Sequence, residues 1–524
     1  MRRLDARLYL FHPVLFALLP VLSLLAHNIN VAPPLHALRP GVIALLLTAA
    51  VLILARRLAG DWEQASLLTS LFVMLFFSYG HVYLGQVTAG TIGLFQTAGL
   101  VGRHLTLLVA WGCILALGSL AIHRAKALRP VMTRMFFAMG LAASAFPVVG
   151  ILSHEVLLRK PWDWAPGEIL VGTATAPASP PDIYLIVLDG HGRSDVLQAI
   201  YDYDSSPFID GLQERGFFVA SQARSNYIQT GLSLASTLNL TYLDFLSKQP
   251  GEASSDRTPV ARLIRQSRLR ALLEDSGYRI IGLSTGFRVT ELEDADLYLR
   301  TPIGAVTEFE RMLTETSGGF ILQDLPTALG FAPFLPGYQA HRERILHSIE
   351  TLQSVASLPG PKFVLAHLLV PHPPFVFDQT GGETSWRYPF SLMEGNMFMG
   401  THEEYIQGYR DQITYVDHVM LDVLSSILAT SPSPPIIVLM GDHGPGSRLA
   451  WDSVERTDLL ERTGILNAYF LPGASQELLY EGITPVNSFR LILDAYFGTE
   501  LGLLPDRSYF STWMQPYSFI PIDG

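Results

Sequence analysis

The stretch that decides the fold is Pro435–Ser447, PIIVLMGDHGPGS. Its five consecutive apolar residues, Ile436–Met440, are typical of a strand that is buried on both faces of a sheet. The strand ends in the tetrapeptide Gly-Asp-His-Gly, which contains Asp442 and His443. Parallel α/β sheets bind their ligands beyond the carboxyl ends of the strands. The sequence therefore predicts a functional site at this strand end.

Other short apolar runs resemble this strand and alternate with helical patterns. Strands are expected at Ile183–Leu188, Arg279–Leu283, Phe363–Val370 and Ala468–Leu471, and helices at 341–355, 403–428 and within 484–498. Such alternation predicts an α/β domain whose mostly parallel sheet is sandwiched by helices.

The first part of the chain has a different character. Five hydrophobic runs, at residues 8–26, 42–55, 65–84, 105–122 and 136–152, have roughly the length of a helix that crosses about 30 Å of hydrocarbon. A shorter apolar stretch at 92–101 is expected to be interfacial or re-entrant. The sequence predicts an α-helical transmembrane bundle of about five spans, with the first span retained rather than cleaved as a signal peptide.

Basic residues fix the expected orientation of these spans. Arginines and lysines cluster before the first span, after the second, and between the fourth and fifth. Because cytoplasmic loops carry the excess of Lys and Arg, we expect a cytoplasmic amino terminus. Five crossings then place the remainder in the periplasm or outside the cell, anchored in the inner (plasma) membrane.

Charge and composition separate three regions. Residues 1–156 are expected to form the transmembrane domain, 157–181 a linker rich in Pro, Gly, Ala and Thr, and 182–524 the extracytoplasmic catalytic domain.

The two ends of the chain differ in charge. Through Glu155 the chain has 11 Lys or Arg against 4 Asp or Glu, a net charge of +7. Because the whole chain has a net charge of −11, the remainder must carry −18. This acidity argues against nucleic acid as a partner. The single cysteine, Cys113, lies in the fourth span, so the outer domain has no disulfide.

Two strand ends deliver acidic side chains. Asp189 ends the run DIYLIVLD, while Asp442 and His443 end the later run. If these strands are neighbours, two carboxylates and an imidazole meet, and a divalent cation between them would remove the repulsion between the two negative charges.

Thr230 precedes a helical segment, where the helix dipole and a metal would favour its alkoxide as a nucleophile. The alternative is that Thr230 is only an N-cap.

In order and spacing, Asp189-Gly190, Thr230, His372 in VPHPPF, and Asp442-His443-Gly444 resemble the alkaline phosphatase and sulfatase superfamily. With its preceding spans, the whole chain looks like the membrane branch typified by lipoteichoic acid synthase and the lipid A phosphoethanolamine transferases. The resemblance implies that Asp189, Thr230, Asp442 and His443 bind a metal. It also implies that Thr230 is the nucleophile, that a phosphorylated enzyme forms, and that His372 binds the substrate phosphate or protonates the leaving oxygen. One departure is Asp189, since the membrane transferases usually carry glutamate there.

Two absences narrow the chemistry. No Cys or Ser lies in the C/S-x-P-x-R context from which sulfatases make formylglycine, so sulfate ester hydrolysis is disfavoured. No histidine follows His443, whereas two-metal phosphatases generally need one. We expect a single divalent cation, with Mn²⁺ or Zn²⁺ preferred to Mg²⁺.

Four side chains are candidates for substrate binding. They are His372, His191, Arg193 and Asn226, which follow strand ends or precede Thr230. Three of them have an alternative role: a structural histidine in a turn for His372, an ion pair with Asp195 for Arg193, and a turn-stabilising role for Asn226. His367 is expected to be a core histidine. The helix from His402 is expected to cover the sheet with an ordinary solvated face that includes Asp417.

These features favour an envelope phosphotransferase that moves a phosphoryl-linked headgroup from a lipid donor, or an envelope glycan, to a hydroxyl acceptor. A membrane-anchored phosphodiesterase or phosphatase is the second hypothesis, which Asp189 favours. A non-catalytic, lipid-sensing protein on the same fold is the third.

Overall fold

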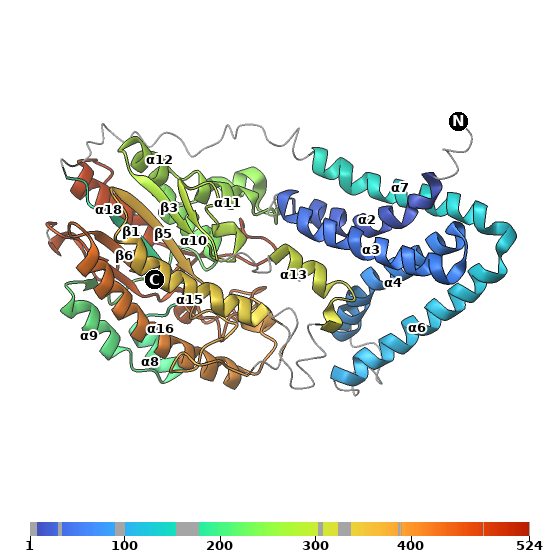
Figure 1. The fold of residues 1–524 in the computed structure, drawn as a ribbon. Coiled ribbons are helices and arrows are strands. Elements are labelled where there is room, and N and C mark those ends of the chain that lie inside the picture. Colours follow the sequence, from blue (N-terminus) through green and yellow to red (C-terminus); the bar gives the residue numbers. More distant parts are fainter. Residues whose placement is uncertain are drawn as a thin grey trace. The chain divides into compact units, whose positions relative to one another are not determined.

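The computed structural model describes residues 8–29, 34–89, 100–153, 177, 179–301, 308–322, 337–385, 388, 390–474 and 476–522 (Figure 1). Most of the expected linker at 157–181 and of the apolar stretch at 92–101 lies outside these residues. Two compact units are present: 1–163 with 306–337, and 164–305 with 338–524. The sequence assigned 306–337 to the outer domain, whereas the structure groups it with the helical unit.

The helical unit contains all five predicted spans as helices. They are α2 (His12–His27), α3 (Leu38–Ala59), α4 (Trp62–Ala89), α6 (Leu100–Arg124) and α7 (Arg129–Ser153). Each is part of a segment long and apolar enough to cross a membrane. Large apolar side chains such as Leu105, Val109 and Leu117 are at least 60% exposed, as expected of a surface that faces lipid. The prediction of a membrane-spanning bundle is confirmed.

A sixth described helix also passes the length and hydropathy criteria. It is α16 (His402–Thr430), whose mean hydropathy of 1.2 is lower than that of the other five. Its apolar side chains, among them Val416, Met420 and Leu424, are buried in the core of the α/β unit. We therefore assign α16 to that unit and not to the membrane.

The segment 308–322 packs on the helical unit. Helix α13 (Glu308–Glu315) places Phe309 in a cluster with Val21 and Leu25 of α2. Phe320 is 1% exposed in a second cluster with residues of α4 and α6. The amide of Gly318 donates to the carbonyl of Phe76 at 2.6 Å. A piece of chain flanked on both sides by the α/β unit is thus an integral part of the helical unit.

The α/β unit is built on a seven-stranded sheet. Its order is β2 (Phe218–Val219), β7 (Asn467–Phe470), β6 (Ile436–Met440), β1 (Ile183–Leu188), β5 (Lys362–Leu368), β3 (Arg279–Leu283) and β4 (Leu297–Leu299). Strand β7 pairs antiparallel with both of its neighbours, and the remaining pairs are parallel. Strands β8 (Ser508–Phe510) and β9 (Ile520–Ile522) form a separate antiparallel pair.

Helices cover both faces of this sheet (Figure 1). Residues Ile183, Leu185 and Val187 of β1 face a core that includes α10 (Thr230–Asn239), α11 (Thr258–Arg265), α12 (Arg268–Asp275) and α18 (Pro485–Phe497). The alternate residues of β1 face a second core with α9 (Ser206–Glu214), α15 (Gly337–Val355) and α16. A strand buried on both faces must be apolar throughout, which explains the continuous apolar runs of β1 and β6.

Candidate functional site

Three adjacent strand ends meet at one edge of the sheet. Strand β1 pairs in parallel with β5 on one side and β6 on the other, so their carboxyl ends coincide. Asp189 follows β1, His372 follows β5, and Asp442 and His443 follow β6. The amide of His372 donates to the carbonyl of Asp189 at 3.0 Å, and Oδ1 of Asp442 accepts from the amide of Gly190 at 3.1 Å. These loops are therefore tied to one another.

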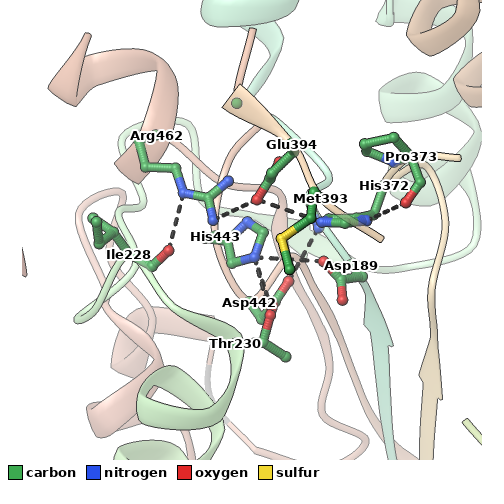
Figure 2. Close-up of polar contacts among 12 residues, drawn as sticks. Asp189, Ile228, Thr230, His372, Pro373, Met393, Glu394, Asp442, His443 and Arg462 are labelled. Carbon is green, nitrogen blue, oxygen red and sulfur yellow. Dashed lines mark hydrogen bonds and ion pairs between the residues drawn. The ribbon is translucent and has the colours of Figure 1, made fainter. Parts of the chain in front are cut away.

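Thr230 completes this group from a helix. It is the first residue of α10, and the N-cap position is occupied by Gln229. The Thr230 hydroxyl lies 3.1 Å from Nε2 of His443 (Figure 2). The structure thus brings the hydroxyl to the predicted ligand residues, and the alternative that Thr230 is only an N-cap does not describe its contacts.

Asp189, Asp442 and His443 have the geometry of a cation site. One ligand atom from each lies within 4.8 Å of the others, and all three residues are buried. Nδ1 of His443 donates to the carbonyl of Gly444 at 2.9 Å, so Nε2 faces Oδ1 of Asp189 at 3.4 Å and Oδ2 of Asp442 at 3.3 Å. Neither of these oxygens has a hydrogen-bond partner among the described residues.

Two buried carboxylate oxygens without hydrogen bonds are costly unless a positive charge is present. A divalent cation with oxygen and imidazole ligands fits this donor set. The residues present therefore fit a metal, which supports the prediction of a divalent cation without identifying it.

His367 fixes the orientation of Asp189. Its Nε2 lies 3.1 Å from Oδ2 of Asp189, and its Nδ1 lies 2.9 Å from the hydroxyl of Thr290. Burial acts to raise the pKa of Asp189, but the charge of His372 and the hydrogen bond with His367 outweigh it and hold the pKa at about 2. Asp189 is thus ionised, and His367 is the core histidine that the sequence predicts, with a supporting role in the site.

His372 contacts an acid that the sequence did not single out. Its Nδ1 donates to the carbonyl of Pro373 at 2.5 Å, and its Nε2 lies 3.4 Å from Oε1 of Glu394 (Figure 2). Burial acts to lower the pKa of His372, but the charges of Glu394 and Asp189 raise it to about 9. The imidazole is therefore in its positively charged form at neutral pH, with both ring nitrogens protonated. Its Nε2 can donate a proton.

Glu394 is held in turn by Arg462. The two side chains are 3% and 1% exposed, and Nη2 of Arg462 lies 2.8 Å from Oε1 of Glu394. Burial acts to raise the pKa of Glu394, but Arg462 and His372 outweigh it, so the pKa lies well below its usual range. Arg462 also donates to the carbonyl of Ile228 at 2.9 Å and to that of Gly444 at 3.0 Å. One buried guanidinium thus joins the loop before Thr230 to the loop after His443.

The other predicted substrate-binding residues are engaged elsewhere. Nε2 of His191 lies 2.8 Å from Asp417, and Arg193 donates from Nε and Nη2 to Asp195. Asn226 accepts from the amide of Val486 and donates to the carbonyl of Arg507. These contacts do not place any of the three on a substrate, and for Arg193 they match the ion pair that the sequence left open. The fully buried His191–Asp417 pair instead supports the loop that follows β1.

Glu461 organises the loop that follows His443. Its carboxylate accepts from the amides of Ser447 and Arg448, at 3.0 and 2.9 Å, and from the hydroxyl of Tyr201. Gly446 lies close by, and a Cβ there would come within 2.5 Å of Oε2 of Glu394. A larger residue at position 446 would therefore require the Glu394 carboxylate to shift away from its present position.

Sequence reasoning missed Glu394, Arg462 and Glu461, and it placed Asp417 on a solvated face. Glu394 lies in an irregular segment between methionines, and Arg462 lies on the short helix α17 (Leu459–Thr463). Neither position follows a strand end, so no periodicity or spacing marked them. Asp417 lies four residues after Ile413 and three before Met420, so it shares the apolar face of α16 with them. This spacing is the one signal that would have indicated that Asp417 is buried.

A known family matches the part of the chain that contains the candidate site. The Sulfatase family model matches residues 181–489. No curated protein sequence matches this chain. The C-terminal periplasmic domain of EptC from Escherichia coli, solved in complex with Zn, is similar at 13% identity and a TM-score of 0.42, covering 67% of this chain and 94% of that one.

Two further solved structures are similar in fold. The integral membrane protein lipooligosaccharide phosphoethanolamine transferase A (EptA) from Neisseria meningitidis has 12% identity and a TM-score of 0.40, and the match covers 98% of this chain and 97% of that one. A 2-O GAG sulfatase has 16% identity and a TM-score of 0.40, with 63% and 73% covered. Since the family model matches more than half of the sequence, the chain belongs to the Sulfatase family.

Proposed function

We propose that this protein is a metal-dependent phosphotransferase of the cell envelope. It would move a phosphoryl-linked headgroup from a membrane lipid to a hydroxyl acceptor through a covalent intermediate on Thr230. The observation that supports this proposal is the position of the Thr230 hydroxyl, 3.1 Å from His443 and at the start of α10. A helix amino terminus favours developing negative charge on that oxygen.

Asp189, Asp442, His443 and Thr230 would hold one divalent cation. Because an imidazole is among these ligands, Mn²⁺ or Zn²⁺ is preferred to Mg²⁺. The chemistry supplied by such a cation, when bound, is a lower pKa for the Thr230 hydroxyl and neutralisation of charge on the phosphoryl oxygens.

Thr230, His372 and water account for each bond and proton. Thr230 loses its proton to water, and its oxygen forms a bond to phosphorus while the bond from phosphorus to the lipid oxygen breaks. His372 gives its proton to that leaving oxygen. In the second half, the acceptor hydroxyl returns a proton to His372, its oxygen bonds to phosphorus, and the Thr230–phosphorus bond breaks. The Thr230 oxygen takes back a proton from water, which restores the starting enzyme.

The membrane helices support a lipid donor. An enzyme anchored in the same bilayer as its donor meets that donor at a high effective concentration. We propose an inner-membrane location with the amino terminus in the cytoplasm and the α/β unit on the outer side, which the distribution of basic residues supports.

The transferase and hydrolase hypotheses differ in their response to an acceptor. We would incubate the full-length protein in detergent with bis(4-nitrophenyl) phosphate and follow nitrophenolate. The transferase proposal predicts a burst of about one nitrophenolate per enzyme, a slow steady rate, and acceleration by a hydroxyl acceptor such as glycerol. Rapid steady turnover that glycerol does not change would instead support the hydrolase, which the choice of Asp189 over glutamate favours.

A further inference from the structure

A cleft in the α/β unit lies apart from the residues of the candidate site. Its volume is ≈ 680 Å³, within the range of about 300–1,000 Å³ typical of small-molecule sites. The lining comes from the segment before Thr230, the start of α18, and the strands β8 and β9. None of Asp189, Thr230, His372, Asp442 and His443 is among the described lining residues.

The cleft is basic on a chain of net charge −11. Arg193, Arg224 and Arg507 line it, and Asp506 is the one acidic residue among the described lining residues. Asp506 is already satisfied, because it accepts from the amide and hydroxyl of Thr484, from the side-chain amide of Asn487 and from Tyr480.

Two of the three guanidinium groups are uncommitted. Arg193 is neutralised by Asp195. Among the residues that the structure describes, the side chains of Arg224 and Arg507 have no ion pair or hydrogen bond. Their backbones are nevertheless fixed: Arg224 bridges to Gly464, and the amide of Arg507 donates to Tyr242 at 2.9 Å. Two positive groups are thus presented from rigid backbone into one cleft.

The rest of the lining is suited to a sugar. The hydroxyls of Thr484 and Ser508 donate to Asp506 and to the carbonyl of Ser225, so their oxygens are left to accept hydrogen bonds from a sugar. Gln222 offers a side-chain amide, while Pro521 and Ile522 supply an apolar wall. Neutral polar groups match sugar hydroxyls, and an apolar wall matches the C–H face of a sugar ring. Guanidinium groups bind phosphate through paired N–H donors.

We propose that this cleft is a second binding site, which takes a phosphorylated sugar. Arg224 and Arg507 hold the phosphate, and the sugar ring lies between the neutral polar groups and the wall of Pro521 and Ile522. The proposal does not depend on the phosphotransferase function, because no residue of the Thr230 site takes part.

The test is a binding measurement on the full-length protein in detergent. Isothermal titration calorimetry with glucose 1-phosphate would compare the wild type with the double variant Arg224→Gln/Arg507→Gln. The matched control, Lys248→Gln/Arg456→Gln, removes two exposed positive charges that do not line the cleft. The single variant Arg507→Gln, at an exposed position, repeats the test if the double variant does not fold.

We expect at least a 10-fold weaker affinity in the double variant, a smaller loss in the single variant, and wild-type affinity in the control. Glucose without phosphate should not bind measurably. The proposal is overturned if the double variant binds like the wild type or if glucose binds as tightly as its phosphate. It is also overturned if vesicles of phosphatidylcholine with phosphatidic acid bind through Arg224 and Arg507 while glucose 1-phosphate does not.

Discussion

The hydroxyl of Thr230 and Nε2 of His443 lie 3.1 Å apart, although 213 positions separate them in the sequence. Thr230 begins a helix that covers one face of the sheet, and His443 follows a central strand. The contact places the hydroxyl beside an imidazole that faces two buried carboxylates, each with one oxygen that lacks a hydrogen-bond partner among the described residues. This relationship is the physical basis for treating Thr230 as a nucleophile.

Replacing Thr230 by Ala should abolish transfer, by about 10³-fold or more in kcat, because no other hydroxyl would stand at that position. Thr230→Ser keeps the hydroxyl and should retain part of the activity. Thr237→Ala is the matched control: it lies on the same helix, and its hydroxyl donates to the carbonyl of Ser233. Wild-type turnover by Thr230→Ala, measured beside circular dichroism of the folded protein, would refute the assignment.

Removing one of the two carboxylates should release the metal. Asp442→Asn weakens a charged ligand, so we expect at least a 10-fold loss of affinity for Zn²⁺ or Mn²⁺. Metal content by inductively coupled plasma mass spectrometry, before and after chelation, provides the readout. Asp452→Asn, at a side chain that is 66% exposed, is the control and should keep its metal. Equal metal content in both variants would argue against the site.

The pair of Arg462 and Glu394 should be strongly coupled. Arg462→Met leaves Glu394 buried without its main partner, which costs about 3–5 kcal/mol of unfolding free energy. The double variant Arg462→Met/Glu394→Leu removes both charges and should be more stable than Arg462→Met alone. Chemical denaturation of the wild type and the two variants measures their free energies of unfolding. If the double variant is the least stable, the pair does not act as described.

Glu461 should give stability a specific pH dependence. Burial raises the pKa of Glu461 above 4.5, its value in an unfolded chain. Between 4.5 and the higher folded pKa the folded protein binds a proton that the unfolded chain has lost, so the free energy of unfolding falls as pH rises through this window. Glu461→Gln cannot ionise and should show a flatter profile. If the melting temperatures of the wild type and Glu461→Gln change in parallel with pH, Glu461 is not the source of this pH dependence.

The segment 308–322 should detach from the membrane helices when Gly80 is enlarged. A Cβ at Gly80 would lie 2.0 Å from the carbonyl oxygen of Glu315, and backbone cannot yield as a side chain does. Gly80→Ala should therefore speed trypsin cleavage at Arg311, measured on the full-length protein in detergent. Gly85→Ala lies on the same helix with nothing within 4 Å of its Cβ, and it should be cleaved at the wild-type rate. Equal rates in both variants would show that Gly80 is not needed for the contact.

The main features of the fold could be predicted because burial leaves a direct trace in sequence. Strands β1, β3 and β6 have the bounds that their apolar runs indicated, and the five spans are helices. Membership in the superfamily that the ordered motifs resemble is confirmed. Short or half-buried strands such as β2 and β4 were not predicted, because two or three residues carry no periodicity.

The supporting residues of the site could not be predicted for a different reason. Asp189, Asp442 and His443 follow strands, so topology alone brings them together. Glu394 and Arg462 reach the site from irregular chain and a short helix, and their pairing depends on tertiary packing. The packing of 308–322 on the membrane helices likewise depends on long-range contacts, to which no local pattern in the sequence corresponds.

The most direct test of the central claim is the intact mass of the full-length protein after exposure to a membrane lipid extract. We predict a mass increase equal to a phosphoryl-linked headgroup, mapped by peptide analysis to Thr230 and missing from Thr230→Ala. An equal adduct on Thr230→Ala, or wild-type turnover without any adduct on Thr230, would contradict the account.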